Sequence, residues 1–328
     1  MRIGLAVLPT LQDDLFSATQ LDQLAGLGEL QIQRGATPDP DELVDLGRDA
    51  DVMISSWRTP RLTAEVLAQC PQLDLLVHAA GSVRPVVSDA LWQRGVRVSS
   101  AAAALSKGVA ESALGMTIAS VKNHWRFAED IRAGGWSAER GRVRELFELT
   151  VGVIGAGNAG SHFISLLQHF DVDVLVHDPM LSAERAADLG ARPVELDTLI
   201  AASDVISLHA PSISATHHMI NARRLAAMKD DAILINTSRG SLIDEDALIH
   251  ELKQGRLFAC LDVTDPEPPA VDNPLRSLPN CILTGHVAGA VTNGKRRIGN
   301  HVVAEIRRYL ADDPLVGEIT EAQLATMA

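Results

Sequence analysis

The chain has 328 residues, of which 46% are hydrophobic and 22% charged, a composition that excludes collagen-like, disordered and disulfide-scaffold proteins. Lys and Arg number 29 against 42 Asp and Glu, so the net charge is −13, and with only 3% aromatic residues this argues against binding to nucleic acids. The length predicts two domains.

The sequence predicts a cytoplasmic protein that does not bind membranes. No apolar run approaches the ~18 residues that cross a bilayer, and the apolar run within residues 1–8 is too short for a signal peptide. Cys70, Cys260 and Cys281 have no CxxC spacing and lie in or beside apolar stretches. We therefore expect reduced, buried thiols.

The first hundred residues alternate short apolar runs with amphipathic stretches. The runs predict strands at 3–8, 30–33, 52–55, 73–78 and 96–99, and the stretches predict helices that include 41–46 and 63–69. Strands that alternate with helices indicate a doubly wound parallel sheet.

Residues 107–131 predict one long helix in which small residues dominate one face. Two interpretations remain open for this face, a contact within the core or a contact between subunits. Gly134, Gly135, Gly141 and the charged run 139–148 then predict an exposed connector.

From Thr150 the alternation restarts and predicts a second doubly wound sheet. Six apolar runs predict strands buried on both faces at 151–154, 174–176, 205–208, 233–235, 258–261 and 282–283, with helices such as 161–170 and 245–254 between them. Six strands with crossovers predict two mononucleotide-binding halves.

Residues 295–310 predict an amphipathic helix. Its apolar face consists of Ile298, Val302, Ile306 and Leu310, and its polar face of Arg296, Glu305, Arg307 and Arg308.

Gly155, Gly157 and Gly160 form a GxGxxG motif that follows a predicted strand and opens a helix near Ser161. In this context the glycines allow a tight turn and close approach of a pyrophosphate to a helix amino terminus. Asp178 ends the next strand, where a carboxylate binds ribose hydroxyls and repels a 2′-phosphate, which favours NAD over NADP. The alternative for the glycine motif is a turn with a purely structural role. The alternative for Asp178 is a residue that ends the strand and starts a turn before Pro179.

Three later strands end in polar residues: Arg239 follows 233–235, Asp262 follows 258–261, and His286 follows 282–283. Because the carboxyl ends of parallel strands bind ligands at one edge of the sheet, we expect these residues to share a site.

The residue types suit reduction of a 2-keto acid. Arg239 has the planar fork that binds a carboxylate, and His286 exchanges a proton near neutral pH. Glu267, in the proline-rich loop 264–269, would orient the His286 ring and stabilise its charge. The alternatives are a surface salt bridge for Arg239, a solvated acid for Glu267 and a structural histidine for His286. HExxH spacing is absent from the sequence, so no metal is predicted.

The chain resembles the D-isomer-specific 2-hydroxy acid dehydrogenase family over nearly its whole length, most strongly across 109–309. The segments that carry the resemblance are 153–160, 234–240, 261–268 and 285–289. The resemblance implies an NAD-dependent oxidoreductase that transfers hydride between a nicotinamide cofactor and a D-2-hydroxy acid or 2-keto acid. It implies that Arg239, Glu267 and His286 are the catalytic residues and that Asp262 binds the nicotinamide carboxamide.

The resemblance also implies the domain organisation. A Rossmann cofactor domain at 102–290 would be inserted in a flavodoxin-like substrate domain formed by 1–101 and 291–328, and two copies would form a homodimer through the cofactor domain. The expected cofactor-binding residues are Gly155, Gly157, Asn158, Ala159, Gly160, Asp178, His209, Ala210, Pro211, Thr237, Ser238, Arg239, Asp262, His286 and Gly289. The expected substrate-binding residues are Gly81, Ser82, Arg239 and His286.

Two segments depart from the family pattern and leave the substrate open. The loop 79–85 has Arg84 where an acid is common, and 99–103 also differs. Arg84 either binds a second acidic group of the substrate, or pairs with a surface acid or caps a helix. The chain ends soon after its last predicted helix, so no regulatory domain is expected. The alternative function is an NAD(H)-sensing binding protein that resembles the corepressors of this family.

Overall fold

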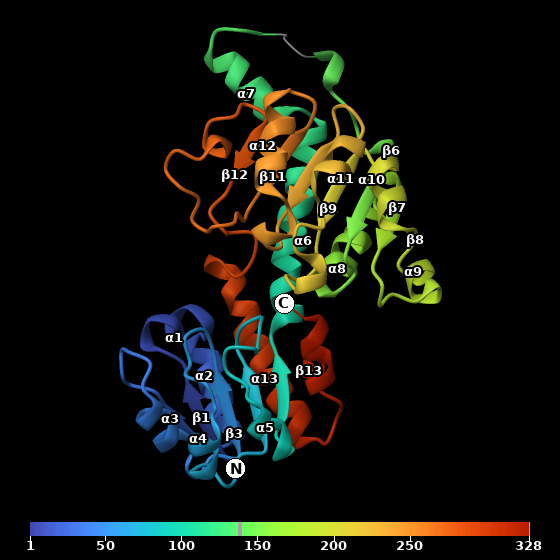
Figure 1. Ribbon diagram of the computed structural model, residues 1–328. Helices are drawn as coiled ribbons and strands as arrows, with labels where there is room; N and C mark the ends of the chain where they lie inside the picture. Colours follow the sequence, from blue (N-terminus) through green and yellow to red (C-terminus); the bar gives the residue numbers. More distant parts are fainter. Residues whose placement is uncertain (137–139, 328) are drawn as a thin grey trace. The chain divides into compact units, whose positions relative to one another are not determined.

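The chain forms two compact units, each with its own sheet and core (Figure 1). The computed structural model describes residues 1–136 and 140–327. Unit 1 comprises Met1–Leu105 and Ala290–Met327, and unit 2 comprises Ser106–Gly289. The unit boundaries lie within a few residues of the expected domain boundaries.

Unit 1 is built on a six-stranded sheet in the order β13-β5-β4-β3-β1-β2. Its strands are β1 (Arg2–Ala6), β2 (Glu29–Ile32), β3 (Val52–Ser55), β4 (Leu75–His78), β5 (Arg97–Ser100) and β13 (Glu318–Ile319). Strands β1 to β5 pair in parallel in the flavodoxin-like order. The expectation of a wholly parallel sheet is wrong at one edge, because β13 pairs antiparallel with β5 and is too short to produce a recognisable pattern.

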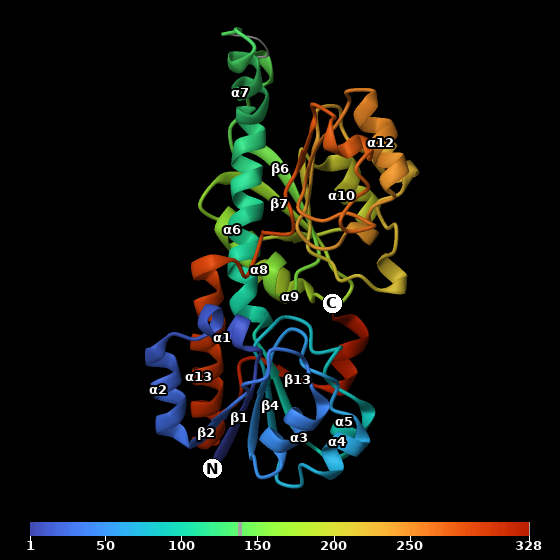
Figure 2. The same cartoon turned by 90° about the vertical axis from the view of Figure 1, so that its left-hand side faces the viewer.

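Helices cover both faces of this sheet (Figure 2). One face carries α1 (Pro9–Leu15), α2 (Ala18–Leu27) and α13 (Arg296–Leu310), and the other carries α3 (Pro40–Gly47), α4 (Ala64–Ala68) and α5 (Asp89–Gln93). The predicted apolar residues Ile298, Val302 and Ile306 of α13 are fully buried.

The prediction that Glu305 lies on the polar face of α13 is wrong. Glu305 is fully buried, and its carboxylate accepts hydrogen bonds from the Ser99 hydroxyl at 2.6 Å and from the N–H groups of Val316 and Gly317 at 3.0 Å. The buried carboxylate is therefore satisfied by Ser99 of β5 and by the segment that leads into β13.

Unit 2 is built on a seven-stranded parallel sheet in the order β12-β11-β10-β9-β6-β7-β8. Its strands are β6 (Phe147–Ile154), β7 (Asp171–His177), β8 (Arg192–Pro193), β9 (Val205–Leu208), β10 (Ile233–Asn236), β11 (Phe258–Leu261) and β12 (Cys281–Leu283). The central order is that of a Rossmann fold, with β6 and β9 at the point where the strand order reverses. Six strands were expected. The seventh, β8, was not predicted because it has only two residues, one of them proline.

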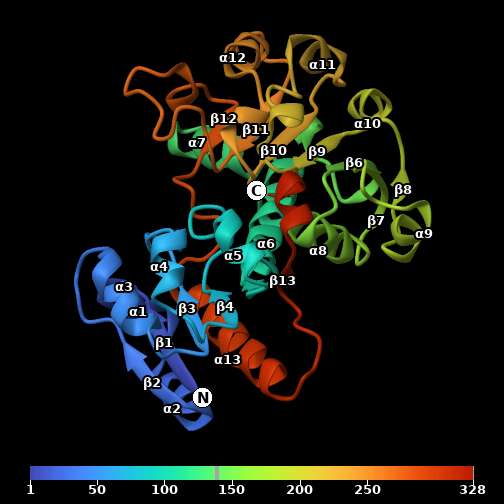
Figure 3. The same ribbon diagram turned by 60° about the horizontal axis from the view of Figure 1, so that its bottom comes forward.

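Helices again form two layers (Figure 3). One face of the sheet carries α10 (Leu196–Ala202), α11 (Ala222–Ala227) and α12 (Glu245–Lys253), and the other carries α6 (Ala102–Val121) and α8 (Asn158–Leu167), while α9 (Ala183–Asp188) precedes the edge strand β8. The exposed connector was expected to extend to residue 148, but it ends earlier, because β6 already begins at Phe147. Glu139 lies outside the described residues.

The predicted helix 107–131 is wrong as a single element. It is divided into α6 and α7 (His124–Arg132) at Asn123, whose φ of 57° lies in the left-handed region that interrupts a helix. The small-residue face of α6, which includes Ala110, Ala113 and Thr117, is buried in the core of unit 2, as the first of the two interpretations expected. None of the residues of α7 is buried, and the helix projects past the sheet of its own unit in Figures 1 and 2.

The described part of the chain includes no helix with the length and apolar character of a membrane span. All three cysteines are buried and unpaired, as expected.

Candidate active site

The glycine-rich loop connects β6 to α8 at the reversal point of the sheet. Gly155 has a φ of 92°, and a Cβ there would lie 2.6 Å from the backbone nitrogen of Ala210, so only glycine fits. A Cβ on Gly160 would lie 1.9 Å from the carbonyl oxygen of Gly155, whereas a Cβ on Gly157 would meet open space. The loop is therefore closely packed on the protein side and open at its middle glycine.

Helix α8 begins at Asn158, not near Ser161 as predicted, so the turn is only three residues long. Asn158 and Ala159 thus lie in the first turn of the helix, where N–H groups have no helical acceptors and can bind a phosphate.

Two neighbouring strands bring polar atoms to the same edge of the sheet. His209 Nδ1, after β9, and Thr237 Oγ1, after β10, are buried and have no hydrogen-bond partner among the described residues. Burial lowers the pKa of His209 to about 4, so its ring is neutral at physiological pH. Ser238 donates to the carbonyl of Ala210 at 2.6 Å and ties the two strand ends together. The open glycine loop and the orphaned polar atoms fit a bound dinucleotide.

Asp178 lies where the sequence predicted, at the carboxyl end of β7. Its carboxylate accepts the N–H of Ala156 in the glycine loop at 2.7 Å and the N–H of Met180 at 2.8 Å. The residue therefore fixes the glycine loop, a contact that the sequence did not predict.

Arg239 follows β10 on a loop that is fixed by hydrogen bonds to the last residue of that strand. The buried Asn236 accepts the N–H of Ser238 at 3.0 Å and donates to the carbonyl of Arg239 at 2.8 Å. The Arg239 side chain is exposed, and in the part of the chain that the structure describes it donates only to the carbonyl of Ser238, at 2.7 Å. Among the described residues, no carboxylate lies within ion-pair distance of it, which argues against a surface salt bridge.

Asp262 shapes the turn that carries His286. Its carboxylate, 2% exposed, accepts the Thr284 hydroxyl at 2.5 Å and the N–H groups of Val287 and Ala288 at 2.9 Å. The His286 N–H donates to the Asp262 carbonyl at 2.8 Å, and His286 has a φ of 56°. Strained backbone of this kind persists where the surroundings enforce it, and here Asp262 enforces it.

The side chains of Glu267 and His286 meet, with 2.6 Å between Oε1 and Nδ1. Both are about half exposed and line a cavity of about 380 Å³ together with Asp262, Thr264 and Arg276. With Nδ1 held by the carboxylate, Nε2 is the ring nitrogen left for proton exchange.

The loop that carries Glu267 is fastened by two residues that the sequence analysis missed. Arg276 donates to the carbonyls of Pro269 at 2.7 Å and Ala270 at 2.8 Å. Glu245, at the start of α12, accepts the Asn273 side chain at 2.6 Å and the Asp265 N–H at 3.4 Å. No motif marks either residue: Arg276 binds backbone carbonyls, and Glu245 binds an amide side chain and a backbone N–H of a loop that is distant from it in sequence.

Gly81 and Ser82 belong to unit 1, in the loop after β4. Arg84, in the same loop, donates to the backbone carbonyls of Leu324 and Met327, which flank the end of the 3-10 helix Glu321–Thr326. The guanidinium therefore acts as a helix cap, in agreement with the structural interpretation. Within residues 1–136 and 140–327, no group of three or more His, Cys, Asp or Glu side chains is arranged to hold a metal ion.

Residues 114–288 match the family model described as "D-isomer specific 2-hydroxyacid dehydrogenase, NAD binding domain". The chain belongs to this dehydrogenase family. The matched residues lie within unit 2, and they include the glycine loop, Arg239, Glu267 and His286. A nicotinamide cofactor is therefore the dinucleotide that this site binds.

Two relatives of known name show how far the likeness to this family extends. The chain is 32% identical over 300 residues to D-3-phosphoglycerate dehydrogenase of Methanocaldococcus jannaschii, a match that covers 91% of this chain and 56% of that protein. It is 32% identical over 273 residues to hydroxypyruvate reductase of Thermotoga maritima, covering 82% of this chain and 88% of that protein. The chain thus spans little more than half the length of the first relative.

Solved structures of this family share the fold. A phosphoglycerate oxidoreductase from Rhizobium etli superposes with a TM-score of 0.85 at 25% identity, covering 98% of both chains. D-2-hydroxyisocaproate dehydrogenase superposes with a TM-score of 0.77 at 25% identity, covering 98% of this chain and 100% of that one.

Proposed function

We propose that the protein is an NAD-dependent dehydrogenase that interconverts a D-2-hydroxy acid and a 2-keto acid. The observation that carries this proposal is the 2.6 Å contact between Glu267 and His286, on the unit that also holds the cofactor loop and the uncompensated Arg239. The dehydrogenase and reductase names of the relatives reported above favour this function over the corepressor-like alternative.

Each residue has a distinct part in the proposed reaction. A nicotinamide cofactor bound at the glycine loop would supply or accept the hydride at C2 of the substrate. In reduction, Arg239 binds the substrate carboxylate and polarises the keto group, and His286 gives a proton from Nε2 to the oxygen of that group. Glu267 holds the ring through Nδ1 and stabilises the imidazolium that precedes proton transfer. Oxidation reverses each transfer.

A screen of 2-keto acids with NADH tests the proposal. We expect saturable oxidation of NADH with at least one D-2-hydroxy acid as product, identified by chiral chromatography. A protein that binds NADH tightly, turns over no keto acid and instead binds a transcription factor would support the corepressor alternative.

The roles of the two units are part of the proposal. Unit 2 would bind the cofactor and unit 1 the substrate, with the N–H groups of Gly81 and Ser82 as donors to the substrate carboxylate. Asp178 would also accept the adenosine ribose hydroxyls and so favour NADH. Comparison of kcat/KM for NADH and NADPH in the wild type tests this, and equal values would remove Asp178 as the selector.

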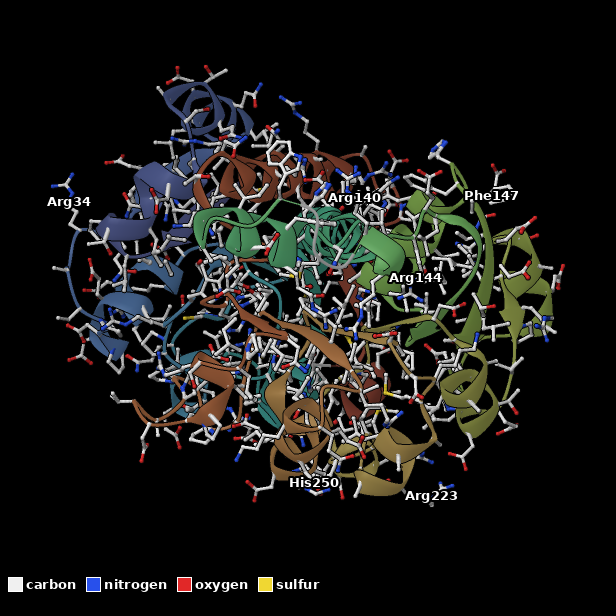
Figure 4. All side chains as sticks on the ribbon, turned by 90° about the horizontal axis from the view of Figure 1, so that it is seen from above. Arg34, Arg140, Arg144, Phe147, Arg223 and His250 are labelled. Carbon is white, nitrogen blue, oxygen red and sulfur yellow. The ribbon has the colours of Figure 1, made fainter. Side chains whose placement is uncertain are left out.

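We also propose that two copies pair through α7 and the segment that follows it. Large apolar side chains are exposed here, with Ile131 at 49%, Trp136 at 75%, Val143 at 39% and Phe147 at 56%; Figure 4 labels Phe147 with Arg140 and Arg144 from the same segment. Exposed apolar side chains gathered in one segment are typical of an interface.

Light scattering during size-exclusion chromatography tests the pairing. We expect a dimer for the wild type and a monomer for the variant Ile131→Glu with Trp136→Glu. Met180→Glu is the control, because Met180 is 76% exposed and lies elsewhere in unit 2, and it should remain dimeric. A monomeric wild type would contradict the proposal.

The three buried thiols suit a reducing compartment, and we propose the cytoplasm as the location of the protein.

A further inference from the structure

The turn that carries His286, residues 284–289, lies at the edge of the sheet of unit 2. It follows β12, the outermost strand on its side of the sheet, and the chain leaves unit 2 directly after Gly289. His286 has a left-handed φ of 56°, a conformation that residues other than glycine rarely adopt. The groups around this turn must therefore hold it in shape.

Asp262 holds the N–H groups of the turn. Its carboxylate accepts those of Val287 and Ala288 at 2.9 Å. An ionised carboxylate has no proton to donate, so it cannot bind the carbonyl groups of the same segment. Fixing the carbonyl of Ala288, which is buried, requires a donor from another element.

Ser112 of α6 is that donor. Its partly buried hydroxyl donates to the carbonyl oxygen of Ala288 at 2.8 Å, across 176 residues of sequence. A hydroxyl within a helix can instead donate to the carbonyl four residues earlier, as Thr117 of the same helix does with Ala113 at 2.7 Å. The Ser112 hydroxyl is thus committed to the His286 turn and not to its own helix.

The backbone of α6 packs against the same turn. Gly108 lies four residues before Ser112 and therefore on the same face of the helix. A Cβ on Gly108 would lie 3.5 Å from the carbonyl oxygen of Ala288 and 3.6 Å from the Cα of Gly289, which is van der Waals contact. The helix therefore supports the turn directly, and Ser112 adds a directional bond to this contact.

We propose that Ser112 is a positioning residue for His286, a role that rests on the proposed function. Asp262 binds the N–H of Ala288 and Ser112 binds its carbonyl, so both polar backbone groups are fixed two positions after the histidine. The fixed backbone keeps the ring where its Nδ1 lies 2.6 Å from Oε1 of Glu267. In the described part of the chain the Ser112 hydroxyl binds only this carbonyl, so Ser112 acts on the ring through the backbone of the turn.

Steady-state reduction of the best keto acid from the screen tests this role. Ser112→Ala removes the donor and should lower kcat about 10-fold, because proton transfer from His286 depends on its exact position. KM for the keto acid and Kd for NADH should remain within about 2-fold of the wild type, because Ser112 is not part of either binding site. Ser112→Thr keeps a hydroxyl and should restore most of the lost kcat. Alanine favours helix, so we expect Ser112→Ala to fold, and thermal unfolding verifies this.

Ser120→Ala is the matched control. Ser120 is also a hydrogen-bonded serine of α6, with Cys260 and the Trp125 indole N–H as its partners at 3.2 Å. It lies eight residues after Ser112, about 12 Å further along the helix, and its bonds do not involve the His286 turn. Its kcat should be that of the wild type.

A double variant separates positioning of His286 from general support of the fold. When Glu267→Gln has already weakened the contact with the ring, Ser112→Ala should lower kcat by no more than about 2-fold, because the two residues act through one contact. An equal loss in both backgrounds, a wild-type kcat in Ser112→Ala, or the same loss in Ser120→Ala would overturn the role of Ser112 alone. A wild type that reduces no keto acid would overturn the proposed function and this role together.

Discussion

Arg239 has an exposed guanidinium without a carboxylate partner among the described residues, and substrate is the partner that we expect for it. Arg239→Ala should lower kcat/KM for keto acid reduction about 10- to 100-fold, because a hydrogen bond to a charged group contributes roughly 1.5–3 kcal/mol. Arg239→Lys should recover only part of the loss, since an ammonium lacks the planar fork. Arg223→Ala, which removes an exposed arginine paired with Asp197, is the control, and its activity should be that of the wild type. Full activity in Arg239→Ala would exclude Arg239 from the site.

Glu267 contributes a charge as well as a hydrogen bond to His286. Glu267→Gln keeps an amide oxygen near Nδ1 but removes the charge, so we expect kcat for reduction to fall on the order of 100-fold with an unchanged Kd for NADH. Asp265→Asn makes the same chemical change two residues away and should leave kcat unchanged. A kcat for Glu267→Gln within a factor of two of the wild type would show that the pair does not act in proton transfer.

At this scale the sequence predicts which residues ought to come together better than it predicts what holds them. Motif spacing places Asp178, Asp262 and His286 at carboxyl ends of strands, and the structure has them there. The bonds from Asp178 to the glycine loop and from Asp262 to the His286 turn join backbone groups of other segments. Backbone groups carry no residue identity, so no sequence pattern reports such contacts.

Among the elements, the loop that carries Glu267 depends on Arg276. Arg276→Ala removes both donors to the carbonyls of Pro269 and Ala270, so the loop should sample positions in which Glu267 no longer contacts His286. We expect kcat to fall about 10-fold. The melting temperature should change little, because the lost hydrogen bonds lie on an exposed loop. Hydrogen exchange of the peptide that spans 264–273 should be faster in the variant. Unchanged exchange together with unchanged kcat would show that other contacts suffice.

The helices show where periodicity alone stops being informative. The predicted helix 107–131 runs across Asn123, yet the left-handed backbone of Asn123 separates α6 from α7. Asn enters this conformation more readily than most residues, which is the only local signal for the break. The prediction that Glu305 is exposed was wrong for another reason. The groups that bind its buried carboxylate belong to other segments of the chain, and helical periodicity carries no information about them.

For the whole molecule, His78 couples folding to pH. Its pKa of about 4 in the folded protein lies below the ordinary 6.5, so the unfolded chain binds the proton more readily. Its full contribution to stability is present above pH 6.5 and is lost as pH falls toward 4, by about 3 kcal/mol. Urea unfolding of the wild type and His78→Gln between pH 7 and pH 4 measures this, because the difference between the two should shrink on acidification. A constant difference would contradict the buried neutral ring.

The division into two units, each with a mostly parallel sheet, follows from the sequence because it rests on many apolar runs, so that one misjudged run does not change it. The edges of the two sheets do not follow, since β8 and β13 have two residues each and owe their existence to a neighbouring strand. Which substrate enters is equally hidden, because the donors expected to recognise it are backbone N–H groups in a loop that departs from the family pattern.

The discontinuity of unit 1 imposes an order on biosynthesis. The core between β1, β3, β4 and α13 contains Ile298, Val302 and Ile306, which leave the ribosome about 190 residues after the first part of this unit is complete. At 5–20 residues per second this takes roughly 10–40 s. During that time the nascent chain lacks α13, which covers part of one apolar face of its first sheet, while unit 2, which is continuous from Ser106 to Gly289, has all the residues it needs to fold. The nascent first sheet is therefore the surface on which we expect a ribosome-associated chaperone to act.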